Sequence, residues 1–116
     1  MKTKVALKGM RFYAFHGYYD FERRIGNNFI LDVIADVDLS EDPNDLIHQT
    51  LNYESIYKIC NEIMQQKYKL LESVAFDIAS QIKKDFSKVS SVEVRLSKLN
   101  PPVGGKVDSS EITITL

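Results

Sequence analysis

The chain has 116 residues, of which 44% are hydrophobic and 27% charged, and this is the length and composition of one globular domain over residues 1–116. Its net charge of -1 offers no general attraction to nucleic acid or to an anionic membrane. No apolar run approaches the roughly 20 residues that cross a bilayer, and "MKTKVALKGM" lacks a signal core, so we expect a cytoplasmic protein.

Two strands are predicted in the first third of the chain. Val5–Phe15 is rich in aromatic and branched residues, and Gly9 is the expected position of a β-bulge within it. From Phe29 to Leu39, apolar residues alternate with polar ones, which is the period-two pattern of a half-buried strand. Ser40–Asp45 has the composition of a turn and ends this strand.

Two amphipathic helices are predicted next. Asn52 is a suitable N-cap for the first helix, whose apolar residues at helical spacing are Ile56, Ile59, Cys60, Ile63 and Met64. The second helix covers Leu71–Phe86 and has apolar residues every three or four positions. Cys60 is the only cysteine, so it forms no internal disulfide. Its place on the buried helix face favours a structural interpretation of the thiol.

Two further strands complete the chain. Val92, Val94 and Leu96 alternate with polar residues, and residues 111–116 alternate in the same way. The order ββααββ predicts an α+β fold with an antiparallel four-stranded sheet and both helices on one face. The two free sheet edges of such a protomer favour pairing with other copies of the chain, and closure into a barrel would remove them.

The connection between the first two strands, residues 16–29, is far longer than the two to five residues of a tight hairpin. Its aromatic content argues against disorder and favours a functional segment. Taken alone, Glu22 is interpreted as a solvated loop charge. His16 is interpreted as a structural imidazole with satisfied nitrogens, in preference to a catalytic or metal-binding residue.

Three other residues allow two interpretations each. Lys98 continues the buried face of the third strand. Its ammonium lies in water at the strand end, which the pattern alone favours, or it lies in a desolvated site. In a desolvated site a lysine has a lowered pKa, which suits a base or nucleophile. Glu72 complements the dipole of the second helix or accepts hydrogen bonds from a ligand with adjacent N–H donors. Tyr53 is interpreted as a packing aromatic.

No metal site or phosphate loop is predicted. His16, His48 and Cys60 are the only soft ligands, and no two of them form a close-spaced pair. Gly104 and Gly105 lie between two strands and not before a helix, unlike the glycines of a phosphate-binding loop.

Several short stretches, taken together, resemble one family. They are "LKGMRFYAFHG", Glu22 followed by "IGNNF", "TLNY", "LLE" and "KLNPP", and they extend over almost the whole chain. In this order and at these separations they are similar to the dihydroneopterin aldolase family of folate biosynthesis. The resemblance implies the tunnelling fold (T-fold), in which ββααββ protomers join their sheets into a tetrameric barrel. It also implies a homo-octamer of two stacked rings, with sites between adjacent subunits.

The resemblance implies a pterin substrate and a retro-aldol reaction. Dihydroneopterin is cleaved to hydroxymethyl-dihydropterin and glycolaldehyde, often with epimerisation of the side-chain carbinol. The imine of the dihydropterin ring accepts the electrons of the broken bond, so no cofactor, metal or lysine Schiff base is implied. The protein has to supply orientation and proton transfer.

The resemblance also assigns roles to individual positions. Lys98 matches the catalytic lysine, and Tyr53 matches the tyrosine that assists proton transfer around the enamine and the departing aldehyde. Glu72 matches the carboxylate that anchors the pterin, and Leu71 would add a main-chain contact beside it. Glu22 matches the loop glutamate that accompanies the lysine and the substrate side chain.

Some positions depart from the family pattern. Asn27 stands where a glutamine is common, Leu99 stands where a proline often follows the lysine, and residues 100–108 form a longer connection than usual. Two alternatives to the aldolase therefore stay open. One is an epimerase acting on a pterin triphosphate, with Arg23 and Arg24 as phosphate ligands. The other is an oligomeric pterin-binding or structural ring without turnover.

Overall fold

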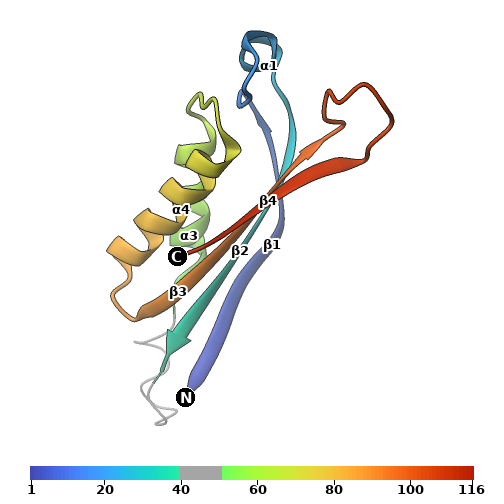
Figure 1. Ribbon diagram of the computed structural model, residues 1–116. Coiled ribbons are helices and arrows are strands. Elements are labelled where there is room, and N and C mark those ends of the chain that lie inside the picture. Colours follow the sequence, from blue (N-terminus) through green and yellow to red (C-terminus); the bar gives the residue numbers. More distant parts are fainter. Residues whose placement is uncertain (40–50) are drawn as a thin grey trace.

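The computed structural model describes residues 1–39 and 51–116. The predicted turn at Ser40–Asp45 and His48 lie outside the described residues. The described elements, in chain order, are β1 (Lys2–Ala14), α1 (Asp20–Ile25), β2 (Asn27–Asp38), α3 (Tyr53–Met64), α4 (Leu71–Asp85), β3 (Val89–Leu99) and β4 (Ser109–Thr115). The predicted order ββααββ is confirmed, with the short helix α1 added between the first two strands (Figure 1).

The four strands form one antiparallel sheet in the order β1-β2-β3-β4. Helices α3 and α4 lie against the same face of this sheet, as predicted (Figure 1). Each edge strand, β1 or β4, pairs with a single neighbour in the described part of the chain. Both edges therefore keep backbone donors and acceptors that another copy of the chain can use.

The core lies between the sheet and the two long helices. Alternate residues of β2 and β3 are buried on this face, and they include Phe29, Leu31, Val33, Val92, Val94 and Leu96. The helices contribute residues at the predicted spacing, including Ile56, Cys60, Val74, Ile78 and Ile82. Removing this apolar surface from water supplies most of the driving force for folding.

Local signals account for where the elements begin and bend. The side chain of Asn52 accepts a hydrogen bond from the Glu54 N–H at 2.9 Å, so the predicted N-cap of α3 is confirmed. The predicted bulge is confirmed too. The register of β1 against β2 shifts between Leu7 and Met10, and Gly9 has a φ of +70°, which glycine adopts without a steric penalty.

Burial of Cys60 raises the pKa of its thiol to about 12, so the thiol stays protonated near neutral pH. This agrees with the structural interpretation of the residue.

None of the described helices is long and apolar enough to cross a membrane.

Candidate active site

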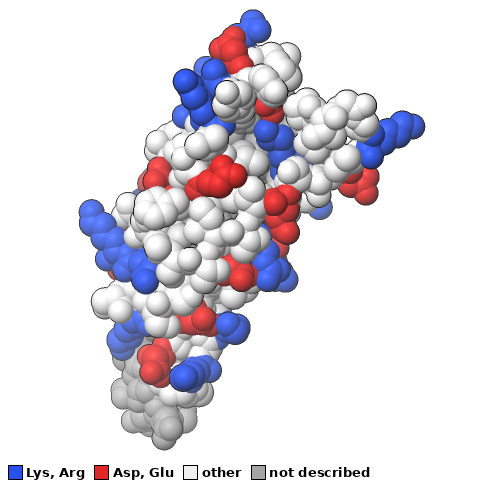
Figure 2. Space-filling view, viewed as in Figure 1, with Lys and Arg blue, Asp and Glu red and all other residues white. Residues whose placement is uncertain are grey.

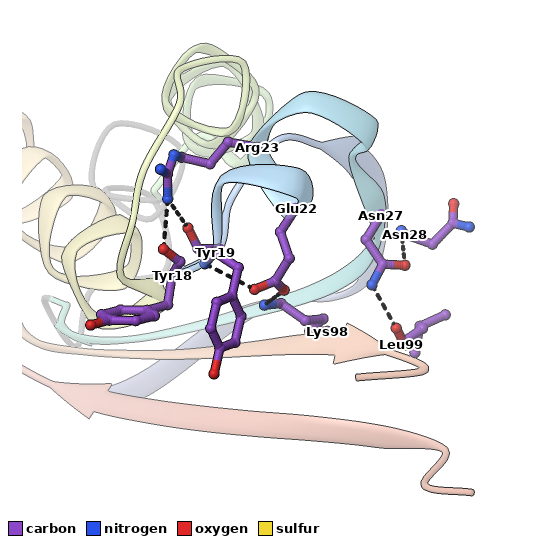
Figure 3. A network of polar contacts seen from close by, with 9 residues as sticks. Tyr18, Tyr19, Glu22, Arg23, Asn27, Asn28, Lys98 and Leu99 are labelled. Carbon is purple, nitrogen blue, oxygen red and sulfur yellow. Dashed lines mark hydrogen bonds and ion pairs between the residues drawn. The ribbon is translucent and has the colours of Figure 1, made fainter. Parts of the chain in front are cut away.

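Lys98 and Glu22 form a buried ion pair at one end of the sheet. The Nζ of Lys98, near the end of β3, donates to Oε2 of Glu22 in α1 at 2.5 Å (Figure 3). Each residue is only 8% exposed in the described chain. The interpretation of Lys98 as a solvated strand-end lysine is therefore wrong, and so is the interpretation of Glu22 as a solvated loop charge.

The Glu22 carboxylate is oriented by α1, the helix that sequence patterns did not predict. Oε1 accepts a hydrogen bond from the Tyr19 N–H at 3.3 Å, while Oε2 faces Lys98 (Figure 3). One oxygen thus satisfies an unpaired donor at the start of the helix, and the other meets the ammonium. Two separate partners restrict the rotation of this side chain more than one contact would.

The adjoining arginines are already engaged within the chain. Nη1 of Arg23 donates to the carbonyl oxygens of Gly17 at 2.7 Å and Tyr18 at 2.8 Å. Arg24 forms an ion pair with Asp20 at 3.0 Å, and Arg23 lies 3.8 Å from the same carboxylate. On the visible face of the molecule, positive and negative side chains are interspersed (Figure 2).

A cavity of 140 Å³ lies beside Glu22, between α1 and the start of the connection that follows β3. Asn27 and Asn100 contribute to its lining. The amide of Asn27 donates to the Leu99 carbonyl at 2.8 Å, so Asn27 ties the start of β2 to the end of β3. Two of the departures from the family pattern, Asn27 and Leu99, are thus in direct contact next to Lys98.

Glu72 lies near this end of the molecule. Its helix, α4, begins directly after the segment that contains Tyr68, and the Tyr68 carbonyl accepts a hydrogen bond from the Gly17 N–H at 2.9 Å. Glu72 is exposed in the first turn of α4, and Leu71 is half-buried. Both interpretations of Glu72, as a partner of the helix dipole and as a ligand acceptor, are compatible with this position.

Tyr53 lies away from the ion pair. It is the first residue of α3, whereas Met64, the last, has its main chain close enough to His16 to influence that ring. At 1.5 Å per residue the helix separates Tyr53 from Met64 by about 16 Å. The Tyr53 side chain is 61% exposed, so its interpretation as a packing aromatic is wrong for the single described chain.

His16 is fully buried beside the ion pair. Its ring packs edge-to-face against Phe29 and Tyr68, and Phe29 is the register partner of Lys98. Neither ring nitrogen makes a hydrogen bond within the usual distance and angle limits among the described residues, although the main chain of Met64 lies close to the ring. Burial, together with the positive charge of Lys98, lowers the pKa of His16 to about 4, and the main chain of Met64 opposes this shift.

The low pKa of His16 predicts a loss of stability in acid. The unfolded chain binds a proton at this residue below about pH 6.5, whereas the folded chain does so only near pH 4. The free energy of unfolding should therefore fall by about 2 kcal/mol between pH 7 and pH 5 on account of His16. Urea unfolding at fixed protein concentration would measure this contribution as the difference between wild type and His16→Phe. Equal pH slopes in the two proteins would contradict it.

Within the described part of the chain, no group of three or more His, Cys, Asp and Glu residues is arranged to hold a metal ion. His48, one of the three soft ligands considered above, is not among those residues.

Residues 5–115 match the family model described as dihydroneopterin aldolase. A relative from Bacillus subtilis named dihydroneopterin aldolase is 36% identical over 114 residues, covering 97% of this chain and 95% of the relative.

Two solved structures show the same fold. A protein from Vibrio cholerae, described as a dihydroneopterin aldolase, superposes with a TM-score of 0.84 at 22% identity over 98% of this chain and 96% of its own. The Escherichia coli dihydroneopterin aldolase in complex with neopterin superposes with a TM-score of 0.80 at 18% identity, covering 98% of each chain.

Proposed function

This chain belongs to the dihydroneopterin aldolase family, and from that membership we propose that it is a carbon–carbon lyase of folate biosynthesis. Its substrate is 7,8-dihydroneopterin, and its products are 6-hydroxymethyl-7,8-dihydropterin and glycolaldehyde. The observation that best supports this proposal is the buried Lys98–Glu22 pair beside a cavity. Taking two charges out of water is costly, and apolar packing would stabilise the fold at least as well, so a buried ion pair at this place favours a functional role.

The proposed reaction consists of one bond cleavage and two proton transfers. Loss of the proton from the second hydroxyl of the side chain lets its oxygen form the aldehyde carbonyl as the adjacent carbon–carbon bond breaks. The electron pair of that bond moves into the ring imine and produces an enamine, while glycolaldehyde departs. The side-chain carbon that remains attached to the ring then receives a proton, and this gives the hydroxymethyl product. No net redox change or added water is required.

Lys98 is proposed to assist the first proton transfer, directly or through water, by passing one ammonium proton to the paired Glu22 carboxylate while its Nζ accepts the hydroxyl proton. Its ammonium is held by Glu22, whose carboxylate is itself held by the Tyr19 N–H. A proton-transfer group of this kind acts only when it lies within hydrogen-bond reach of the substrate. Glu22 therefore has the proposed role of orienting Lys98 and contacting the substrate side chain in the adjoining cavity.

Glu72 is proposed to anchor the pterin ring. A carboxylate accepts two parallel hydrogen bonds from the aminopyrimidinone edge, and the main chain of Leu71 offers a further contact. The exposed position of Glu72 in the first turn of α4 supports this role, because the carboxylate is free to meet a ligand.

Replacing Glu72 by glutamine should weaken pterin binding by about 1.5 to 3 kcal/mol, because a charge-assisted acceptor is lost. The melting temperature should change little. Calorimetry with a nonreactive pterin measures the affinity, and Glu62→Gln on α3 provides a control at another exposed glutamate. Unchanged affinity in Glu72→Gln would remove this residue from the proposed site.

Tyr53 is proposed to reach the site from a neighbouring subunit. Its position at the far end of α3 keeps it from the ion pair of its own chain, and the two open sheet edges suit a closed ring. The proposed assembly is an octamer of two stacked tetrameric rings with sites between adjacent subunits.

A cytoplasmic location, as expected from the sequence, also stays a prediction.

Two alternatives are weaker. A triphosphate epimerase needs free cationic groups, but Arg23 is bonded to two carbonyl oxygens and Arg24 is paired with Asp20. A ring without turnover would have no reason to keep Lys98 and Glu22 paired and buried, since such pairs contribute little to stability compared with apolar packing.

The function is tested by incubating the purified protein with 7,8-dihydroneopterin and, separately, with its triphosphate. Glycolaldehyde and the epimer are followed in both reactions. Release of glycolaldehyde from the unphosphorylated substrate is expected. Turnover of the triphosphate alone would favour the epimerase, and binding without turnover of either compound would favour the pterin-binding ring.

A further inference from the structure

Gly17 occupies a position where no side chain fits beside Glu22. A Cβ atom at Gly17 would lie 2.5 Å from Cβ, 2.6 Å from Cδ and 2.8 Å from Oε1 of Glu22. Carbon atoms that are not bonded pack at about 3.5 to 4.0 Å, so one of the two residues would have to move. The backbone of Gly17 does not have a positive φ, so its conformation admits other residues and the Glu22 side chain provides the restriction.

The main chain of Gly17 is held on both sides. Its N–H donates to the Tyr68 carbonyl at 2.9 Å, and its carbonyl oxygen accepts from Nη1 of Arg23 at 2.7 Å. The same Nη1 donates to the Tyr18 carbonyl at 2.8 Å (Figure 3). The Arg23 side chain is 20% exposed, so these hydrogen bonds are partly shielded from water. These hydrogen bonds hold the Gly17 main chain in place, and the Glu22 side chain packs directly against it.

The Gly17 main chain also connects the two parts of the proposed site, the one that contains Glu22 and the one that contains Glu72. Tyr68 precedes the first turn of α4, where Glu72 lies, and the Tyr68 hydroxyl donates to Asp77 in the same helix at 2.7 Å. Through the Gly17–Tyr68 hydrogen bond, the segment that carries Glu22 is attached to the segment that carries the proposed pterin anchor.

We propose that Gly17 and Arg23 are positioning residues that determine where the Glu22 carboxylate lies, and thereby where the Lys98 ammonium meets the substrate. Neither is proposed to touch the reacting atoms. The inference rests on the proposed function as far as turnover is concerned, while the packing of Gly17 against Glu22 can be tested without turnover.

Gly17→Ala should lower kcat by about 10²-fold, because a displacement of about 1 Å in a catalytic group has an effect of this size. The affinity for a nonreactive pterin should change less than kcat, since Glu72 is not displaced. Gly105→Ala is the matched control. Gly105 is exposed, and an added Cβ there meets no atom within 4 Å. Equal kcat in Gly17→Ala and wild type would overturn the proposal.

A double-mutant cycle separates positioning from a general structural effect. The three atoms nearest to an added Cβ at Gly17 all belong to the Glu22 side chain. In a Glu22→Gly background, Gly17→Ala should therefore cause no further fall in kcat or in melting temperature. Equal falls in both backgrounds would show that Gly17 matters for a reason other than Glu22, and would overturn the inference.

The neighbouring arginines provide a second matched pair. Arg23→Gln removes the guanidinium that holds Gly17 and Tyr18, and kcat should fall about 10-fold. Arg24→Gln removes only the exposed pair with Asp20 and should leave kcat unchanged. If Gly17→Ala does not fold, this pair decides the question, and equal kcat values for the two variants would overturn the proposal.

The outcomes distinguish this inference from the proposed function. Wild-type protein that turns over no pterin would overturn the function. In that case the melting-temperature cycle still tests the packing of Gly17 against Glu22, and additive effects there would overturn the inference independently.

Discussion

Replacing Lys98 by alanine is expected to lower kcat by about 10²- to 10⁴-fold, which is the usual contribution of a positioned proton-transfer group. The expectation follows from the burial of Lys98 and from its pairing with Glu22, which lines a cavity. Steady-state release of glycolaldehyde measures the change, and light scattering checks that the oligomer persists. Lys88→Ala, at an exposed lysine, is the control.

Loss of Lys98 also leaves the Glu22 carboxylate without its cation, so the melting temperature should fall. Glu22→Gln combined with Lys98→Ala removes both charges. This double variant should regain part of the melting temperature while kcat stays low. Recovery of kcat together with stability would make Lys98 a structural residue only. Borohydride added during turnover should trap no adduct, and an adduct at Lys98 would replace the ring-imine route with Schiff-base catalysis.

Coexpression of Lys98→Ala chains with Tyr53→Phe chains is expected to restore activity that neither variant has alone. The reason is the proposed shared site, in which Lys98, Glu22 and Glu72 of one subunit meet Tyr53 of its neighbour. With random assembly, about one quarter of the sites would contain both the lysine and the tyrosine. The purified mixed ring should therefore reach about one quarter of wild-type kcat per site.

The control for this rescue is a mixture of the two preformed homo-oligomers under conditions without subunit exchange, where no gain is expected. Mass spectrometry of the intact assemblies identifies the mixed rings. Mixed rings no more active than the average of the two parents would count against a shared site, provided that each single substitution lowers activity strongly. Tyr53 would then have to act within its own chain, across the length of α3.

The sequence determined the four strands, the two long helices and the family. Period-two and helical spacings reflect which side chains face the core, and that information is local. The N-cap at Asn52, the bulge at Gly9 and the order ββααββ along the chain were predictable because their signals are local. The resemblance to the family assigned functional roles to Lys98 and Glu22. The pattern of apolar and polar residues alone, however, predicted that both side chains are solvated.

Only the tertiary structure decided the environment of these charges. Lys98 and Glu22 are 76 residues apart in sequence, and their ion pair depends on the antiparallel register of β2 with β3 and on the short helix α1. Helix α1 has only six residues, too few for a periodic signal. The constraint on Gly17 was equally invisible, because it comes from a side chain packed against it in space and not from its own backbone conformation. Burial and pairing of charges depend on contacts between distant segments, and local spacing carries no information about those contacts.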